Sequence, residues 1–318
     1  MATWFQNSLD NYQIQVYKLK VMASKHPITK LIVPLAGLGT RFAPSSTAYP
    51  KELTHLVDKP ILQYLVEEAV ESGIKEIIFI LNQSKDSIQK YFSPKYQDAY
   101  LEKAFSKPDD APEDLIKLHE LIKKIKFRYI KKQSTLGDGH SILFARPFIK
   151  SNEAFVVSMG DLLGFDDHPF IQQLMEVYEE KNVPVVSVEK VPLEATSRFG
   201  VIKPKKSKGR LHQVVDIIEK PGPALAPSRL ILTGKYILTP EFFSILENLV
   251  KNHTNGEVKL ADALKVYSHT HEMYAYECKG KIQDTGNKLD FIRATINFGI
   301  THPKFAKPLK KFIKSLKL

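Results

Sequence analysis

The chain has 318 residues and carries 46 lysines and arginines against 35 acidic side chains, a formal net charge of +11 at pH 7. Hydrophobic residues make up 43% of it, which excludes wholesale disorder, and the scattered Gly and Pro residues exclude a collagen-like or low-complexity architecture. Cys278 is the single cysteine, so an intramolecular disulfide and a cysteine-based zinc site are excluded, and we expect a reducing, cytoplasmic location.

The first part of the chain predicts an N-terminal extension followed by a βαβ unit. Residues 1–29 form the extension, with helical spacing of apolar residues over 11–24. The first strand is expected over 30–36, a short apolar run that suits a strand covered on both faces. Apolar positions recur at helical spacing over 61–70, and a second apolar run follows at 76–81. A strand, a helix and a strand in this order form a right-handed parallel unit.

The alternation of helices and strands continues, and from about residue 200 short strands become frequent. We expect helices within 94–126 around a loop at 107–112, a strand at 126–130, a helix from 141, a strand at 154–159, a helix at 169–181 and a strand at 183–188. Beyond these we expect short strands at 200–202, 211–218 and 230–232, helices near 240–251 and 257–267, and a strand at 273–278. The pattern predicts an α/β fold in which a mostly parallel central sheet, flanked by helices, carries a smaller mixed-sheet lobe.

A glycine turn lies directly after the first strand. Gly37 and Gly39 let the backbone approach a ligand closely, and successive amides in such a turn attract an anion. The dinucleotide-binding fingerprint needs a third glycine at the position of Phe42, which disfavours a dehydrogenase. Arg41 offers phosphate a bidentate fork and Lys51 a mobile point charge, so the turn and its two cations suit a nucleoside triphosphate.

Further short motifs extend this pattern along the chain. Together the motifs are Gly37-Leu-Gly-Thr-Arg41, Pro50-Lys-Glu52, Asp58-Lys-Pro60, Gly137-Asp-Gly-His140, Met159-Gly-Asp161, Phe199-Gly-Val201, Glu219-Lys-Pro221, Gly234-Lys-Tyr236, Gly256-Glu257, Asp262-Ala-Leu264 and Asp284-Thr-Gly-Asn-Lys288. With them the chain resembles the sugar-1-phosphate nucleotidylyltransferases, and within these the bacterial UTP–glucose-1-phosphate uridylyltransferases, over residues 30–300. The resemblance implies a Rossmann-like nucleotide-diphospho-sugar transferase fold for that domain.

The resemblance also implies a reaction. An oxygen of glucose 1-phosphate would attack the α-phosphorus of UTP, giving UDP-glucose and pyrophosphate, with Mg²⁺ as the cofactor. The expected partners are UTP and glucose 1-phosphate, in a homo-oligomer that binds no nucleic acid and makes no stable membrane insertion. In agreement with the last point, no apolar stretch approaches the roughly 18 residues that span a bilayer.

The resemblance assigns the substrate sites residue by residue. On the nucleotide side, Arg41 and Lys51 would hold the departing pyrophosphate. On the sugar side, Lys220 would meet the attacking phosphate, Glu219 would accept hydrogen bonds from sugar hydroxyls, and Gly200 would let the chain pass close to the sugar ring. The other residues expected to contact substrate are Ala36, Gly37, Gly39, Thr40, Glu52, Gln133, Gly137 and Gly160, the first three through backbone groups at the base and ribose.

Two aspartates are candidates for the metal. Asp161 follows the apolar run 154–159, so we expect it at the carboxyl end of a strand, where open α/β sheets place ligands. Its carboxylate is the hard oxygen ligand that Mg²⁺ prefers. By resemblance to the wider superfamily, Asp284 is a second metal ligand, and a turn-forming role is the alternative.

Several positions depart from the uridylyltransferase pattern. Thr47 stands where the family usually has a lysine, and Tyr49 stands where it has an isoleucine. Lys132 stands where the family has a base-reading glutamine, with Gln133 beside it as a substitute. Two alternatives stay open: the same reaction with another nucleotide or sugar phosphate, and a low-activity regulatory paralogue that binds sugar nucleotides. A nucleic-acid-binding protein is supported by net charge alone, without aromatic residues interleaved in the basic segments.

Residues 301–318 predict a basic amphipathic helix. This segment carries six lysines and no acid, and Leu309, Phe312, Ile313 and Leu316 fall on one helical face. Such a helix packs on its own subunit or on a neighbouring one, or else lies on an anionic membrane or binds a partner. Docking on a subunit is the simpler interpretation.

Overall fold

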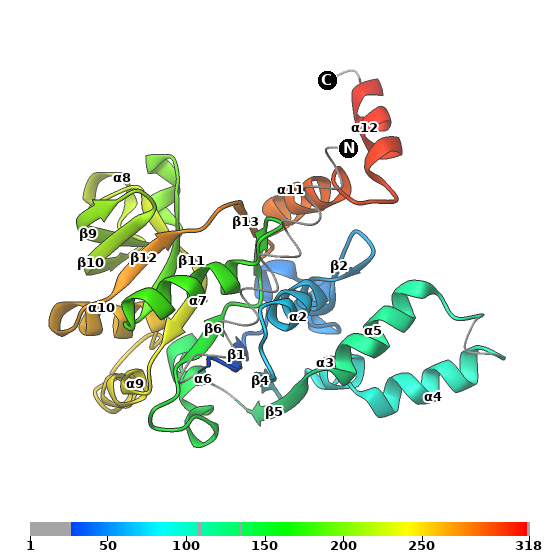
Figure 1. Cartoon of the computed structure of the whole chain (residues 1–318), viewed down its shortest axis with the longest axis horizontal. Helices are drawn as coiled ribbons and strands as arrows, with labels where there is room; N and C mark the ends of the chain where they lie inside the picture. Colours follow the sequence, from blue (N-terminus) through cyan, green and yellow to red (C-terminus); the bar gives the residue numbers. More distant parts are fainter. Residues whose placement is uncertain (1–26, 107–109, 134, 317–318) are drawn as a thin grey trace.

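The structure is a computed structural model that describes residues 27–106, 110–133 and 135–316 (Figure 1). The helix predicted over 11–24 lies outside the described residues. Ile28 is already buried in the core, so close packing begins before the first strand.

A single nine-stranded sheet runs through the molecule (Figure 1). Its strands follow the order β5 (Lys126–Lys132), β4 (Glu76–Asn82), β1 (Lys30–Leu35), β6 (Phe155–Ser158), β11 (Leu230–Leu238), β8 (Val185–Lys190), β12 (Tyr274–Glu277), β10 (Leu211–Glu219) and β9 (Gly200–Lys208). The first four are parallel, as predicted, and β1 lies between β4 and β6. Their continuous apolar runs are buried on both faces because helices cover both sides of the sheet.

Two hydrophobic cores flank the sheet, because alternate residues of each central strand point to opposite faces. Leu31 and Val33 of β1 belong to one core, and Ile32 belongs to the other. The first core is covered by α2 (Ile61–Glu71), α5 (Glu113–Lys123) and α7 (Phe170–Lys181). The second is covered by α6 (Asp138–Leu143), α9 (Glu241–Lys251) and α10 (Leu260–Thr270).

The strands beyond β6 curl into a ring of pairings. β11 runs antiparallel to both β6 and β8, and a pairing of Ile231 with Val201 joins it to β9 as well. The strands β11, β8, β12, β10 and β9 therefore complete a closed circuit. The predicted mixed-sheet lobe is thus continuous with the central sheet, and β9, β10 and β11 extend beyond the short runs that the sequence predicts.

Shorter elements complete the fold. These are α3 (Asp86–Tyr91), α4 (Pro94–Ala104), α8 (Gly222–Leu225) and α11 (Lys288–Gly299), with the two-stranded sheets β7 (Leu162–Phe165)–β13 (Lys281–Asp284) and β2 (His55–Leu56)–β3 (Lys59–Pro60). β7, β13 and α11 were not predicted from the sequence. The predicted C-terminal helix forms as α12 (Ala306–Ser315), which projects from one end of the molecule (Figure 1) and has no buried residue. Across the described chain, no helix has both the length and the apolar composition needed to cross a membrane.

Candidate active site

The glycine turn and Asp161 leave the sheet at the same edge. β1 and β6 are parallel neighbours, so their carboxyl ends meet; the turn at 36–39 follows β1, and Asp161 follows β6. Gly39 has a φ of 67°, in the left-handed region that favours glycine. A Cβ at Gly37 would meet no atom within 4 Å, so the protein's own packing leaves this side of the turn open.

Lys51 faces Asp161 across this edge. Its Nζ donates a hydrogen bond to Asp161 Oδ2 at 2.6 Å. Burial by itself would lower the pKa of Lys51, but Asp161 and Glu52 raise that pKa above its ordinary value, against a smaller lowering by the charge of Arg41. Lys51 is therefore held as an ammonium ion, close to the other phosphate-side cation and to the expected metal ligand.

Asp161 and Asp284 face each other across Gly286. The pairing of β13 with β7 places Asp284 opposite Leu162, the residue after Asp161. A Cβ at Gly286 would lie 2.8 Å from Asp161 Oδ2 and 3.0 Å from Asp284 Oδ1, so a larger residue would crowd both carboxylates. Burial raises the pKa of Asp284, the N–H of Gly286 opposes this, and the charge of Asp161 raises the pKa further.

This pair of carboxylates fits a magnesium ion. No group of three or more Asp, Glu, His or Cys side chains is arranged to hold a metal within the ranges that the structure describes. Mg²⁺ does not need such a cage, because it is commonly bound by one or two carboxylates and completes its shell with substrate phosphate and water. Asp161 and Asp284 supply that number of carboxylates next to the glycine turn.

Arg198 holds Asp284 from another direction. Its Nη2 donates to Asp284 Oδ2 at 2.7 Å and to Asp290 Oδ2 at 2.5 Å, while Asp284 Oδ1 accepts from the Gly286 N–H at 2.7 Å. Lys51 and Arg198 thus neutralise the two carboxylates in this arrangement. A cation bound between Asp161 and Asp284 would take over part of that task.

The predicted sugar-side residues meet where β9 and β10 pair. Glu219 ends β10 opposite Gly200, and a Cβ at Gly200 would come within 3.2 Å of Glu219 Oε2. Lys220 follows with a φ of 49°, which few non-glycine residues adopt and which often marks a functional position. Lys259 donates to Glu219 Oε1 at 3.1 Å; burial lowers the pKa of Lys259, but the hydrogen bond and charge of Glu219 raise it above its ordinary value.

Glu52, which we expected to contact substrate, is buried beneath the site. It is 3% exposed, and its Oε1 accepts a hydrogen bond at 2.8 Å from the Nζ of Lys85, which is 4% exposed. Burial lowers the pKa of Lys85, and Glu52 opposes that effect. Glu52 Oε2 has no hydrogen-bond partner among the described residues. In this structure Glu52 therefore fixes the turn that carries its neighbour Lys51.

A cavity of about 280 Å³ opens beside the glycine turn. Its lining includes Thr40, Thr47 and Lys85. Thr47, which we expected at the position of a lysine in the family, donates its hydroxyl to the carbonyl of Pro44 at 2.7 Å. The cavity therefore lacks the charge that a lysine at position 47 would add, and the ammonium of Lys85 is already balanced by Glu52.

Packing alone accounts for Gly137 and Gly160, two of the glycines that we expected near substrate, and for Gly139 in the same motif as Gly137. A Cβ at Gly137 would lie 2.6 Å from the carbonyl oxygen of Val258, and one at Gly139 would lie 2.9 Å from the same atom. A Cβ at Gly160 would collide with the side chain of Leu35. These glycines let backbone segments approach one another, so their presence does not by itself indicate a ligand.

The two candidates for reading the nucleobase lie at the end of β5, the same edge of the parallel strands as the glycine turn. The ammonium of Lys132 lies 4.2 Å from the centroid of the Phe144 ring, a cation–π contact. Gln133 is exposed. Gln133 is therefore the more accessible of the two side chains for a base.

Comparison with known proteins identifies the family. Residues 30–298 match the family model described as nucleotidyl transferase, so the chain belongs to this enzyme family. It is 38% identical over 298 residues to UTP–glucose-1-phosphate uridylyltransferase of Bacillus subtilis, covering 91% of this chain and 97% of that protein. It is 40% identical over 291 residues to the protein of the same name from Staphylococcus haemolyticus, covering 91% and 98%.

Solved structures agree with the fold. A UTP-bound UGPase from Acinetobacter baumannii matches with a TM-score of 0.80 at 31% identity, covering 91% of this chain and 100% of that one. A UDP-glucose pyrophosphorylase complexed with UDP-glucose matches with a TM-score of 0.75 at 33% identity, covering 85% and 98%. The predicted α/β nucleotidyltransferase fold and the resemblance stated from the motifs are both confirmed.

Sequence reasoning missed three basic residues of this region. Lys85 and Arg198 lie outside every motif, so nothing in the sequence singled them out. Lys259 carried a weak signal, because it lies between two of the short motifs that support the resemblance. All three are paired with acidic residues that the motifs do contain.

Proposed function

We propose that this chain transfers the uridylyl group of UTP to glucose 1-phosphate in an Mg²⁺-dependent reaction, giving UDP-glucose and pyrophosphate. The observation that carries the proposal is the Lys51–Asp161 pair with Asp284 beside it, at the edge where the glycine turn leaves the sheet. Relatives that share 38% and 40% identity over 91% of the chain bear the name of this activity. Structures described as UTP-bound and as complexed with UDP-glucose share the fold.

The reaction is an in-line displacement at phosphorus, in which positioning and charge neutralisation supply most of the catalysis. A phosphate oxygen of glucose 1-phosphate bonds to the α-phosphorus of UTP. The bond from that phosphorus to the oxygen bridging to the β-phosphate breaks, and its electron pair leaves with pyrophosphate. Arg41 and Lys51 neutralise the leaving group, and Lys220 holds the attacking phosphate. Glu219, positioned by Lys259, accepts hydrogen bonds from sugar hydroxyls.

Asp161 and Asp284 would hold Mg²⁺, which when bound neutralises charge on the phosphates. Asp161 Oδ2 accepts from Lys51 in this structure. With the metal held by Asp161, the Lys51 ammonium would be free to meet the triphosphate. The same cation therefore balances a carboxylate before the nucleotide binds and a phosphate afterwards.

A matrix of substrates tests the proposal. Pyrophosphate release is followed for UTP, dTTP, CTP, ATP and GTP against several sugar 1-phosphates, with Mg²⁺ and with a chelator. We expect the highest rate with UTP and glucose 1-phosphate, and no turnover once the metal is chelated. A higher rate with another pair would support the alternative that Thr47 and Lys132 suggest. Binding of sugar nucleotides without turnover anywhere in the matrix would support a regulatory role.

A further inference from the structure

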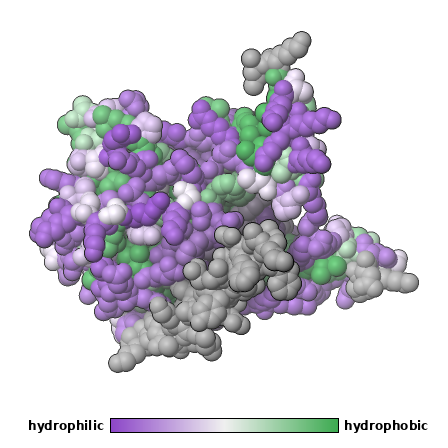
Figure 2. Space-filling view, turned by 45° about the horizontal axis from the view of Figure 1, so that its top comes forward, coloured by the Kyte–Doolittle hydropathy of each residue, from purple (hydrophilic) through white to green (hydrophobic). Residues whose placement is uncertain are grey.

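Helix α12 carries an apolar stripe that the rest of the described subunit leaves exposed. Phe312 is 59% exposed, Leu316 directly after the helix is 44% exposed, and Phe305 directly before it is 43% exposed. At 3.6 residues per turn these side chains fall with Leu309 and Ile313 in a sector of about 100°. Figure 2 shows hydrophobic residues among hydrophilic ones on this projecting segment.

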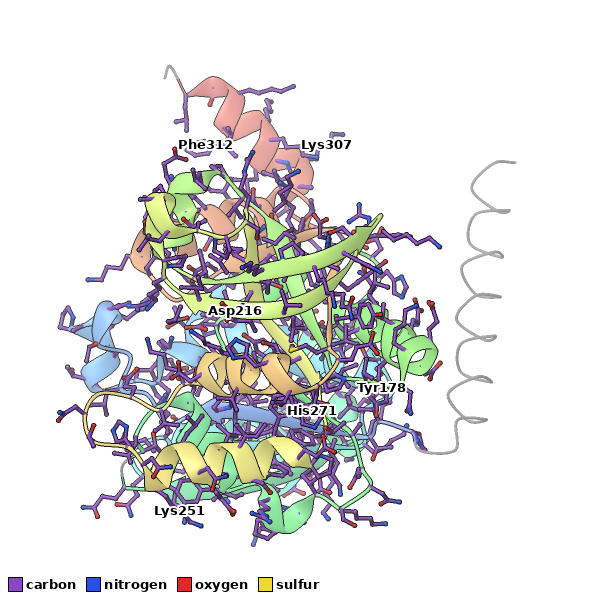
Figure 3. The ribbon with its side chains drawn as sticks, turned by 90° about the vertical axis from the view of Figure 1, so that its left-hand side faces the viewer. Tyr178, Asp216, Lys251, His271, Lys307 and Phe312 are labelled. Atoms are coloured by element: carbon purple, nitrogen blue, oxygen red, sulfur yellow. The ribbon has the colours of Figure 1, made fainter. Side chains whose placement is uncertain are left out.

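The opposite side of the helix is basic. The exposed lysines of this segment are Lys304, Lys307, Lys310, Lys311 and Lys314. Figure 3 shows Lys307 and Phe312 on opposite sides of α12. Since residues 301–318 contain no aspartate or glutamate, the segment offers one sign of charge alone.

Contacts near the start of the helix hold it in this position. A Cβ at Gly299, the last residue of α11, would lie 2.6 Å from Leu309 Cδ2, so the two helices pack closely there. His302 Nε2 lies 2.9 Å from Asp58 Oδ2 in the connection between them. The later part of the helix, which carries Phe312, therefore extends from a fixed base away from the sheet (Figure 1).

We propose that α12 binds the surface of an anionic phospholipid membrane and lies in its interfacial plane. A helix of 10 residues is about 15 Å long and is too short to cross a bilayer. An apolar stripe with aromatic residues, opposed by a row of lysines, inserts at the level of the headgroups while the ammonium groups extend to the lipid phosphates.

Charge and apolar character together select this occupant over nucleic acid. The lysines of this segment fit a partner of opposite charge, which the phosphates of anionic lipids supply. Nucleic acid has the required charge but offers no apolar surface to Phe312 and Leu316. The exposed apolar residues of α11 differ from this stripe, because the pair Asp290–Arg293 flanks them rather than a row of lysines.

Sedimentation of the full chain with lipid vesicles tests the proposal. We expect binding to phosphatidylcholine vesicles that contain phosphatidylglycerol, weakened by added salt, and little binding to pure phosphatidylcholine. Replacing Lys310, Lys311 and Lys314 by Gln should lower the partition coefficient by roughly 100-fold. The charge-matched control replaces the exposed Lys205, Lys206 and Lys208 of β9 by Gln and should leave the partition unchanged.

The apolar stripe is tested separately. Phe312→Gln together with Leu316→Gln should weaken binding by at least about tenfold, because two apolar side chains no longer enter the interface. The matched control is Leu193→Gln with Leu225→Gln, two exposed leucines on other segments. Since every replaced residue is exposed, the thermal unfolding midpoint and pyrophosphate release should be the same in all these variants.

Three results would overturn the proposal. One is equal binding to neutral and anionic vesicles, or binding to neither. Another is an oligomer that dissociates in the Phe312/Leu316 variant while lipid has no effect, which would assign the stripe to a second copy. The third is DNA binding that needs the α12 lysines, in a chain whose vesicle binding does not need them.

Discussion

Lys51 and Asp161 are separated by 110 positions in the chain, yet their charged atoms lie 2.6 Å apart. The contact joins the loop after the glycine turn to the loop after β6, so it links the expected phosphate-binding and metal-binding parts of the site. Asp161 keeps Lys51 protonated although the lysine is largely buried, because the carboxylate raises the pKa that burial would lower. A protonated lysine is what a triphosphate requires when it enters.

Asp161→Asn should lower Mg²⁺-dependent pyrophosphate release by at least about 100-fold, because an amide is a much poorer ligand for Mg²⁺ than a carboxylate. Asp161 is only partly buried, so circular dichroism should show an intact fold. Steady-state assays with UTP and glucose 1-phosphate measure the effect, with the exposed Asp167→Asn as the control. Full activity of Asp161→Asn would remove this residue from the reaction.

Lys220→Ala should raise the KM for glucose 1-phosphate by about tenfold or more, the cost of a charge-assisted hydrogen bond, and leave the KM for UTP nearly unchanged. Initial rates with each substrate varied in turn separate the two constants. Lys203→Ala removes an exposed lysine from β9 and should change neither. An unchanged KM for glucose 1-phosphate would show that the sugar site lies elsewhere.

Lys259→Met should also raise the KM for glucose 1-phosphate, by a smaller factor than Lys220→Ala, because Lys259 acts by holding Glu219. The turnover number at saturating sugar phosphate should stay close to that of the unchanged protein. Lys259→Gln keeps a donor toward Glu219 and should recover part of the loss. If Gln and Met behave alike, the hydrogen bond does not position Glu219.

The Mg²⁺ requirement should depend on pH through Asp284. Burial and the charge of Asp161 raise the pKa of this carboxyl, so protons compete with the metal at a higher pH than for an ordinary aspartate. The Mg²⁺ concentration for half-maximal pyrophosphate release should increase as the pH falls through that raised pKa, and level off above it. Asp284→Asn should need more Mg²⁺ near neutral pH and show a flatter profile. An identical profile in this variant would rule out Asp284 as the titrating ligand.

Glu52→Leu should lower the free energy of unfolding by about 3 kcal/mol, because it leaves the buried Lys85 without its counter-charge. The double variant Glu52→Leu/Lys85→Met removes both charges and should recover much of that loss. Urea unfolding of the two single variants and the double variant completes the cycle. Simple addition of the single effects would mean that the two side chains do not stabilise one another.

The parts of the fold that the sequence predicted are those with an unbroken apolar signal. β1, β4 and β6 are continuous apolar runs, which a strand buried on both faces requires. β7 and β13 have four residues each and no clear alternation, so they escaped notice. Their pairing brings Asp284 to Asp161, a proximity that only the resemblance could indicate beforehand.

The site was predictable in its motifs and less so in its side-chain directions. A motif says which residues occur together, but it does not say which of them turn inward. Glu52 therefore entered the list of expected substrate contacts, although the structure buries it against Lys85. Gly137 and Gly160 have packing reasons that are visible only once Val258 and Leu35 lie beside them.

Strand β9 pairs with β10 over most of its length and with β11 at Val201–Ile231, and β11 in turn pairs with β6. Gly200 and Glu219 are consequently connected through sheet pairings to β6, the strand that leads to Asp161. The distance between the nucleotide-binding and the sugar-binding parts of the site is therefore set by the main chain. Substitutions on the surface do not alter it. A relative that uses a different sugar phosphate would therefore have to change the side chains and loops between the two parts of the site, since the sheet sets the distance between them.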